Sequence, residues 1–169
     1  MAIKIFNTLG KQKEEFKPLK SGRVSFYQCG PTVYWTQHIG NMRAAVIADV
    51  IRRSFEYTGL AVNYVRNYTD VGHLVSDSDM GEDKMEKGAK REGLSPKEIA
   101  AKYIKIFEND LRDLNVEEPT QKPLATEYIT EMQAMIQALM EKGFAYKTEL
   151  AVYFDVSKAK DYNRLSKQI

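Results

Sequence analysis

The chain contains 169 residues, of which 43% are hydrophobic and 28% charged, as expected for a globular domain, alone or with an insertion. These proportions exclude a disordered polyelectrolyte, a collagen-like repeat and a disulfide-rich miniprotein. The net charge of +2 does not by itself predict nonspecific binding to nucleic acid. A single cysteine excludes an intrachain disulfide and favours a reducing cytoplasm. We expect no membrane attachment, since neither a signal peptide nor a run of ~18 apolar residues is seen.

The first half of the chain predicts a unit of strand, helix and strand. Residues 3–9 and 23–28 favour two strands, separated by a polar loop over 10–22. Apolar residues at spacings of three and four predict a helix over 40–58, and 61–68 predict the next strand. The apolar stripe of this helix is expected to comprise Val46, Ile47, Val50, Ile51 and Phe55. The strands on either side of such a crossover helix run parallel.

The second half begins with a charged segment, 77–93, which predicts a surface loop. Ser95, followed by proline and three residues later by Glu98, predicts a capped helix start. Its apolar face is expected to comprise Ile99, Tyr103, Ile106, Phe107, Leu111 and Leu114. A linker is expected between Pro119 and Pro123.

The chain continues with a helix predicted over 126–142 and a β-hairpin predicted over 144–156. The helix is expected to turn five apolar residues inward: Ile129, Met132, Ile136, Leu139 and Met140. The alternation of strands and helices predicts the α/β class. Ligands of parallel sheets bind beyond the carboxyl ends of the strands, so 29–41 and 69–76 are expected to form two walls of one site.

The segment 29–41 contains the only cysteine, the only tryptophan and one of the two histidines. The amino terminus of the following helix offers backbone amides and a positive dipole end to an anion. His38 and Asn41 can donate to one phosphate group, and Gly40 allows close approach of the backbone. This favours phosphate or nucleotide binding. The alternative is that Asn41 caps the helix and His38 packs on the loop, since no G-x-G-x-x-G or P-loop motif is present.

Cys29 has three interpretations: metal ligand, nucleophile or buried apolar filler. Thiolate suits zinc, with His38 and His73 as candidate co-ligands, but no Cys-x-x-Cys pair accompanies it. A nucleophilic cysteine needs a base beside it, and the sequence places none there. The residues alone therefore favour a buried structural cysteine.

The chain closely resembles the N-terminal part of the bacterial cysteinyl-tRNA synthetases, a class I family. The matching segments cover the chain in order: 5–9, 13–18, 29–34, 38–41, 64–67, 69–70, 142–146, 154–155 and 165–166. The resemblance implies the first half of a Rossmann-type parallel sheet, with a connective insertion of helices and a β-hairpin. Residues 1–94 would form the nucleotide-binding half and 95–169 the insertion.

The resemblance also implies an activity: L-cysteine is activated with ATP and Mg²⁺ to cysteinyl-adenylate and then transferred to tRNA(Cys), by a monomer. His38 and Asn41 would be catalytic, as parts of the HIGH-type signature, and Cys29 would be a zinc ligand. Zinc would select cysteine by binding its thiolate. The implied ATP-binding residues are His38, Gly40, Asn41, Thr32 and Tyr34, and the implied cysteine-binding residues are Cys29, Gly30 and Thr69.

The sequence departs from the family pattern in three places. Asn41 stands where the signature has histidine, and we expect its amide to keep a donor there. Residues 71–74 read Val-Gly-His-Leu in place of acids and a lysine. The other zinc ligands and the KMSKS loop are expected after residue 169, so the chain is expected to be an inactive fragment. The alternatives are a non-catalytic nucleotide- or RNA-binding module and a related cysteine ligase of mycothiol synthesis.

Overall fold

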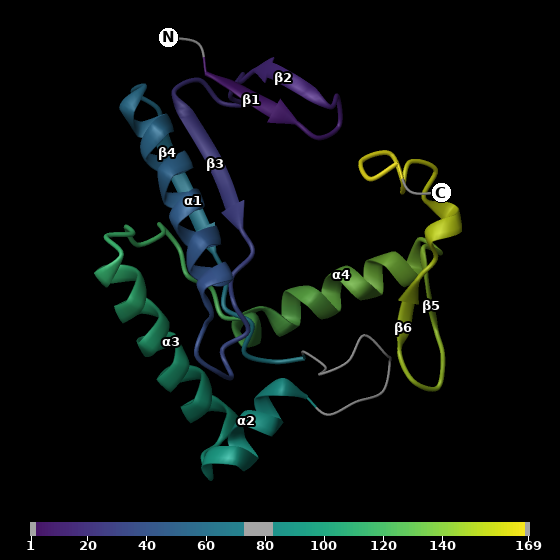
Figure 1. Cartoon of the computed structure of the whole chain (residues 1–169). Helices are drawn as coiled ribbons and strands as arrows, with labels where there is room; N and C mark the ends of the chain where they lie inside the picture. The colour runs from purple at the N-terminus through teal and green to yellow at the C-terminus, as the bar shows by residue number, and fades with distance from the viewer. Residues whose placement is uncertain (1–2, 73–82, 168–169) are drawn as a thin grey trace. The chain divides into compact units, whose positions relative to one another are not determined.

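The computed structural model describes residues 3–72 and 83–167 (Figure 1). Contacts divide the chain into two compact units, one made of residues 19–128 and the other of residues 1–18 with 129–169. No helix in the described part of the chain is long and apolar enough to span a bilayer. The predicted division at residue 94 remains a prediction.

The unit of residues 19–128 is built on parallel strands. Strand β3 (Arg23–Gln28) pairs in parallel with β4 (Ala61–Arg66), and α1 (Ile39–Tyr57) connects them. Phe26 lies opposite Tyr64 in this register, and their rings stack 4.8 Å apart. The predicted strand, helix and strand are confirmed.

The expected linker between Pro119 and Pro123 extends the sheet instead. The backbone N–H of Arg66 donates to the carbonyl of Gln121 at 3.1 Å, and that of Tyr68 donates to the carbonyl of Pro123 at 2.9 Å. The bridges to this segment are parallel. A proline lacks the N–H but keeps its carbonyl, so an edge position tolerates it.

The buried stripe of helix α1 shares only Phe55 with the one predicted. Ala45, Ala48, Asp49 and Phe55 are its buried residues. Three residues of the predicted stripe are exposed: Ile47, Val50 and Ile51. Small alanine side chains let a helix approach a sheet closely, whereas the spacing of large apolar residues indicated a stripe rotated away from this contact.

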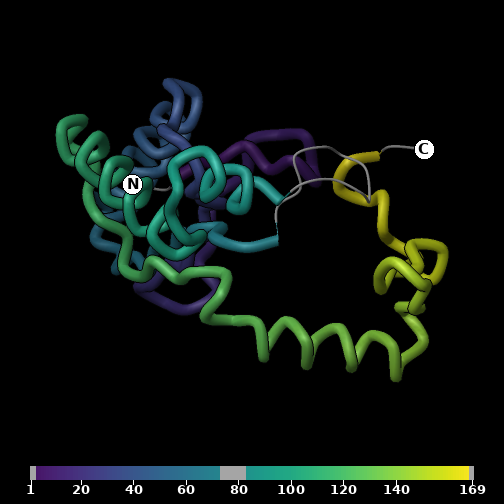
Figure 2. Tube along the Cα trace, turned by 90° about the horizontal axis from the view of Figure 1, so that it is seen from below, coloured from purple at the N-terminus to yellow at the C-terminus, as the bar shows by residue number. Residues whose placement is uncertain are grey.

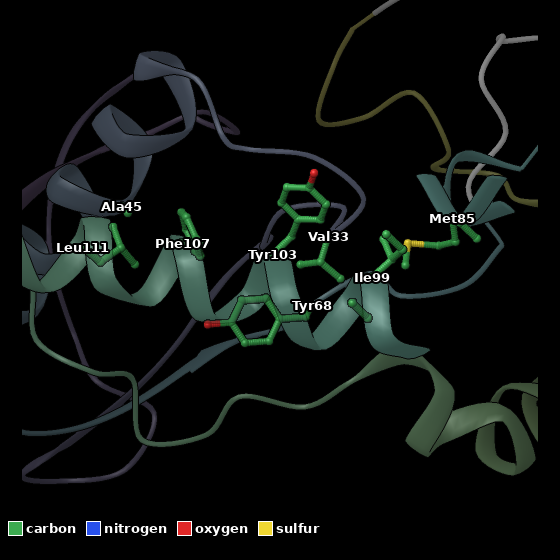
Figure 3. Packing of buried hydrophobic residues seen from close by; sticks show 10 residues of the cluster. Val33, Ala45, Tyr68, Met85, Ile99, Tyr103, Phe107 and Leu111 are labelled. Carbon is green, nitrogen blue, oxygen red and sulfur yellow. The ribbon is translucent and has the colours of Figure 1, made fainter. Parts of the chain in front are cut away.

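Helices α2 (Lys84–Glu92) and α3 (Pro96–Asp113) complete the core. The predicted loop over 77–93 is wrong from residue 84 onward, and residues 77–82 lie outside the described part. Asp83 caps α2, and the capping box that Ser95 predicts is present at α3. Figure 3 shows a row of buried side chains along α3, made of Ile99, Tyr103, Phe107 and Leu111. Leu114, expected on that face, is half exposed.

The core covers one face of the sheet. Every second residue along β4 and just after it points to this face. These residues are buried beneath the helices: Tyr64, Arg66 and Tyr68. The opposite face is largely open: Ser25 and Asn63 are exposed, and Tyr27 has 62% of its surface accessible.

The other unit contains two hairpins and a helix. Strands β1 (Lys4–Asn7) and β2 (Gln12–Glu15) are antiparallel, and β2 falls where a loop was predicted. The helix predicted over 126–142 begins with a 3-10 turn, η1 (Ala125–Tyr128), which still belongs to the unit of residues 19–128. It continues as α4 (Ile129–Glu141), which Figure 2 shows as one regular helix. None of its residues is buried, so the predicted inward face is wrong. The predicted hairpin is confirmed as β5 (Ala145–Lys147) and β6 (Val152–Phe154), before a short turn, η2 (Val156–Lys158).

Candidate functional site

The loops that leave β3 and β4 lie side by side, as expected for parallel strands. The N–H of Val33 donates to the carbonyl of Thr69 at 3.1 Å, and the N–H of Thr69 donates to that of Pro31 at 3.0 Å. Thr32 therefore lies opposite Thr69 in a parallel bridge. The expectation that these two segments adjoin is confirmed at Thr69, and residues 73–76 lie outside the described part.

Asn67 fastens the two loops together. Its Oδ1 accepts from the N–H of Gly30 at 2.8 Å and from the hydroxyl of Tyr27 at 2.9 Å, and its Nδ2 donates to Oγ1 of Thr69 at 3.2 Å. A Cβ on Gly30 would lie 1.6 Å from the backbone oxygen of Asn67. Only glycine fits there. Our sequence reasoning gave Asn67 no role in the site, although a polar residue directly after β4 is a usable signal.

His38, rather than Asn41, caps α1. Its Nδ1 accepts a hydrogen bond from the backbone N–H of Gly40 at 3.0 Å. With Nδ1 as acceptor, the neutral ring carries its proton on Nε2, which is left as a donor. His38 and Gly40 are exposed, and the first turn of α1 contains no acidic residue to offset the positive end of the dipole. The helix start can therefore receive an anion.

A small pocket joins three of the predicted residues: Cys29, Gly30 and Asn41. Its remaining lining is Gln28, Pro31, Ala44, Ala45, Arg66 and Phe107. The volume of about 40 Å³ suits water molecules and is far below that of ligand pockets, ~300 Å³ or more. A larger ligand would therefore bind over the loops and the start of α1, outside this pocket.

Arg66 is a buried cation beside this pocket. It is 2% exposed, and its Nε and Nη1 have no hydrogen-bond partner among the described residues. Its guanidinium lies 5.2 Å from the ring centroid of Phe107. Burial raises the pKa of Tyr68, two residues along the same face, to about 12. The sequence signal that we missed is an arginine between two buried tyrosines in a strand.

Cys29 is exposed, so the interpretation as a buried structural cysteine is wrong. Its Sγ lies 3.8 Å from the carbonyl oxygen of Gly30. Within 3–72 and 83–167, no three His, Cys, Asp or Glu side chains gather as metal ligands. Nδ1 of His38 accepts from the backbone N–H of Gly40, and His73 lies outside those ranges. A catalytic zinc site needs three protein ligands, and the described residues offer one candidate.

A sequence model of the class I tRNA synthetase (C) catalytic domain matches residues 15–169. The chain belongs to this family. The predicted family and the predicted class I type of parallel sheet are thereby confirmed.

Curated relatives of this synthetase domain cover nearly the whole chain. Cysteine–tRNA ligases of Lactobacillus delbrueckii subsp. bulgaricus and Fusobacterium nucleatum are each 49% identical over 98% of it, and cysteine–tRNA ligase 1 of Burkholderia lata is 45% identical over 99%. The chain spans 33% of the length of the first two and 36% of the third.

A solved structure supports the fold. Agrobacterium radiobacter K84 agnB2 LeuRS, in a ternary complex with tRNA and LeuAMS, matches 77% of this chain and 16% of its own with a TM-score of 0.57. The sequences are 19% identical, so this likeness concerns the fold alone.

In this synthetase domain, α2 and α3 contact the loop before α1 through Arg91. The guanidinium lies 3.7 Å from the ring centroid of Trp35, and its Nη2 donates to the carbonyl of Tyr34 at 2.9 Å. Glu92 accepts from the same Nη2 at 2.8 Å, and its other oxygen accepts from Lys102 at 2.5 Å. Tyr34, a predicted ATP-binding residue, is thus held by α2.

We expect Glu92 to make the stability of this region dependent on pH. Hydrogen bonds from Lys102, Tyr103 and Arg91 lower the pKa of Glu92 from 4.5 to about 2. Its contribution is fully present above the unfolded-state pKa, near 4.5, and is lost as the pH falls toward 2. The difference in unfolding free energy between the wild type and Glu92→Gln should therefore shrink over that window, in denaturant titrations at successive pH values. A constant difference would contradict these contacts.

Proposed function

We propose that this chain is part of the catalytic domain of a cysteine–tRNA ligase. The whole enzyme would activate L-cysteine with ATP and transfer the cysteinyl group to tRNA(Cys), working as a cytoplasmic monomer. The observation that carries the proposal is the adjacency of the Cys29–Thr32 loop, Thr69 and the start of α1 at one end of a parallel sheet. The identity to cysteine–tRNA ligases along the chain supports the choice of substrate.

The start of α1 would bind the phosphates of ATP, delivered with Mg²⁺. A carboxylate oxygen of cysteine attacks the α-phosphorus, a new P–O bond forms, and the bond to pyrophosphate breaks. Negative charge grows on the α-phosphate oxygens, where Nε2–H of His38, the side-chain amide of Asn41 and the positive end of the α1 dipole would lower its energy. Thr32 and Tyr34 would line the nucleotide from the preceding loop.

The amino acid would lie against Cys29, Gly30 and Thr69. Because Gly30 has no side chain, none projects from the loop at this position. The hydrogen bond from its N–H to Asn67 restrains the backbone there. Cys29 is the one residue for which we propose a role in binding zinc. Its exposed thiol would become a ligand after deprotonation. Two further protein ligands would have to join it, so we assign zinc no step here.

The test combines ATP binding with ATP–pyrophosphate exchange. We expect the 169-residue chain to bind ATP, measured by calorimetry, and to show no cysteine-dependent exchange, because it spans about a third of its relatives. His38→Ala should weaken ATP binding. Failure of the wild type to bind ATP would overturn the proposed binding of ATP at the start of α1. Rapid cysteine-dependent exchange would contradict the expectation that these 169 residues alone do not catalyse the reaction.

A further inference from the structure

The loop between β3 and α1 is contacted by α2. Arg91 stacks on Trp35 and donates to the carbonyl of Tyr34. Gly88, one turn earlier on α2, approaches so closely that a Cβ there would lie 3.1 Å from the same carbonyl oxygen. Lys84 lies 6.0 Å from the ring centroid of Tyr34. One face of a short helix thus contacts two successive loop residues.

The guanidinium of Arg91 is itself held by Glu92 and Tyr103. Its Nη2 lies 2.8 Å from Glu92 and 3.3 Å from the hydroxyl of Tyr103 on α3. The Tyr103 ring lies 6.0 Å from that of Trp35, so the guanidinium is bordered by two aromatic rings. A planar guanidinium can stack and donate at once, which a lysine ammonium cannot. The position therefore uses features specific to arginine.

The loop transmits this constraint to the start of α1. The Gln37 amide donates to the carbonyls of Thr32 at 3.1 Å and Trp35 at 3.0 Å, which closes the loop on itself directly before His38. The Trp35 side chain is 46% exposed, and its ring is contacted by the guanidinium of Arg91 and lies 6.0 Å from the ring of Tyr103. Arg91 is therefore a restraint on the outer side of the loop.

We propose that Arg91 is a positioning residue, which orders the loop of residues 32–37 so that His38 and the first turn of α1 are presented to a nucleotide phosphate. This rests on the proposed function. Arg91 itself does not touch the ligand. Its contacts disfavour loop conformations that lack the binding geometry. The fraction of molecules with a binding-competent loop therefore rises, and the apparent dissociation constant for ATP falls in proportion.

Trp35 is the only tryptophan, so its fluorescence reports on this loop alone. We compare the wild type with Arg91→Met, Arg91→Lys and the control Lys87→Met, which removes a charge from an exposed position of the same helix. Arg91→Met should raise quenching of Trp35 by acrylamide and weaken ATP binding about tenfold, as expected if the competent fraction falls by that factor. Arg91→Lys should resemble Arg91→Met, and Lys87→Met should resemble the wild type.

The two readouts separate the two proposals. If the wild type does not bind ATP, the proposed function fails, and the quenching comparison alone decides whether Arg91 orders the loop. Unchanged quenching in both Arg91 variants overturns the inference. Raised quenching with unchanged ATP affinity overturns it too, because the loop order would then have no consequence for binding. If Arg91→Met does not fold, Arg91→Lys supplies both readouts.

Discussion

Gly30→Ala is expected to lower the free energy of unfolding by about 3 kcal/mol, at the upper end of the range for overpacked positions. The new methyl carbon would lie 1.6 Å from the backbone oxygen of Asn67, so the two loops have to separate. Separation also breaks the hydrogen bond from Gly30 to Oδ1 of Asn67. The measurement is chemical denaturation followed by circular dichroism.

Gly10→Ala is the matched control for this prediction. A Cβ at Gly10 would meet Oε1 of Glu14 at 2.3 Å, but that atom is the end of a flexible side chain and can move aside. We expect a change within about 0.5 kcal/mol, the usual range for surface substitutions. If Gly30→Ala cost no more than Gly10→Ala, the close contact between the two loops would be refuted.

Substitution of His38 separates its two roles. His38→Ala should lose the cap of α1 and with it about 1 kcal/mol of stability. It should also bind ATP at least tenfold more weakly, since a hydrogen bond to a charged group contributes about 1.5–3 kcal/mol. Calorimetric titration and denaturation of the same samples give both quantities.

His38→Asn is the companion variant, because asparagine is a good cap but lacks the imidazole Nε2–H. We expect stability within about 0.5 kcal/mol of the wild type, with the weak ATP binding of His38→Ala. Full recovery of ATP affinity in His38→Asn would show that capping, and not donation by the ring, is what the nucleotide requires.

The local signals in the sequence predicted most of the fold. The capping box at Ser95 and the strands on either side of α1 depend on residues close in sequence, and all are confirmed. The buried stripe of α1 was missed because hydrophobicity favours Ile47 and Val50, whereas close packing selects the alanines. Helix α2 was missed because its charged sequence resembles a loop, and tertiary contact with the core stabilises it.

The site was predictable where topology decides it. Parallel strands bring their carboxyl ends together, which placed Cys29 and Thr69 on adjoining loops. The position of Asn67 directly after β4 was a usable signal, but its partners, like those of Arg91, depend on which atoms meet across long separations. Their assignment required the register of the sheet and the packing of α2.

The edge segment that pairs with β4 has a consequence for how this unit folds. The N–H of Tyr64 donates to Oγ1 of Thr120, 56 residues later, and the neighbouring ladder bonds join equally distant parts of the chain. Such contacts form only after a long loop has closed, and the entropy of closure slows proteins rich in them. The pairing of β3 with β4 closes a shorter loop, so it can form first. The edge segment around Gln121 can then pair with the exposed backbone groups of β4.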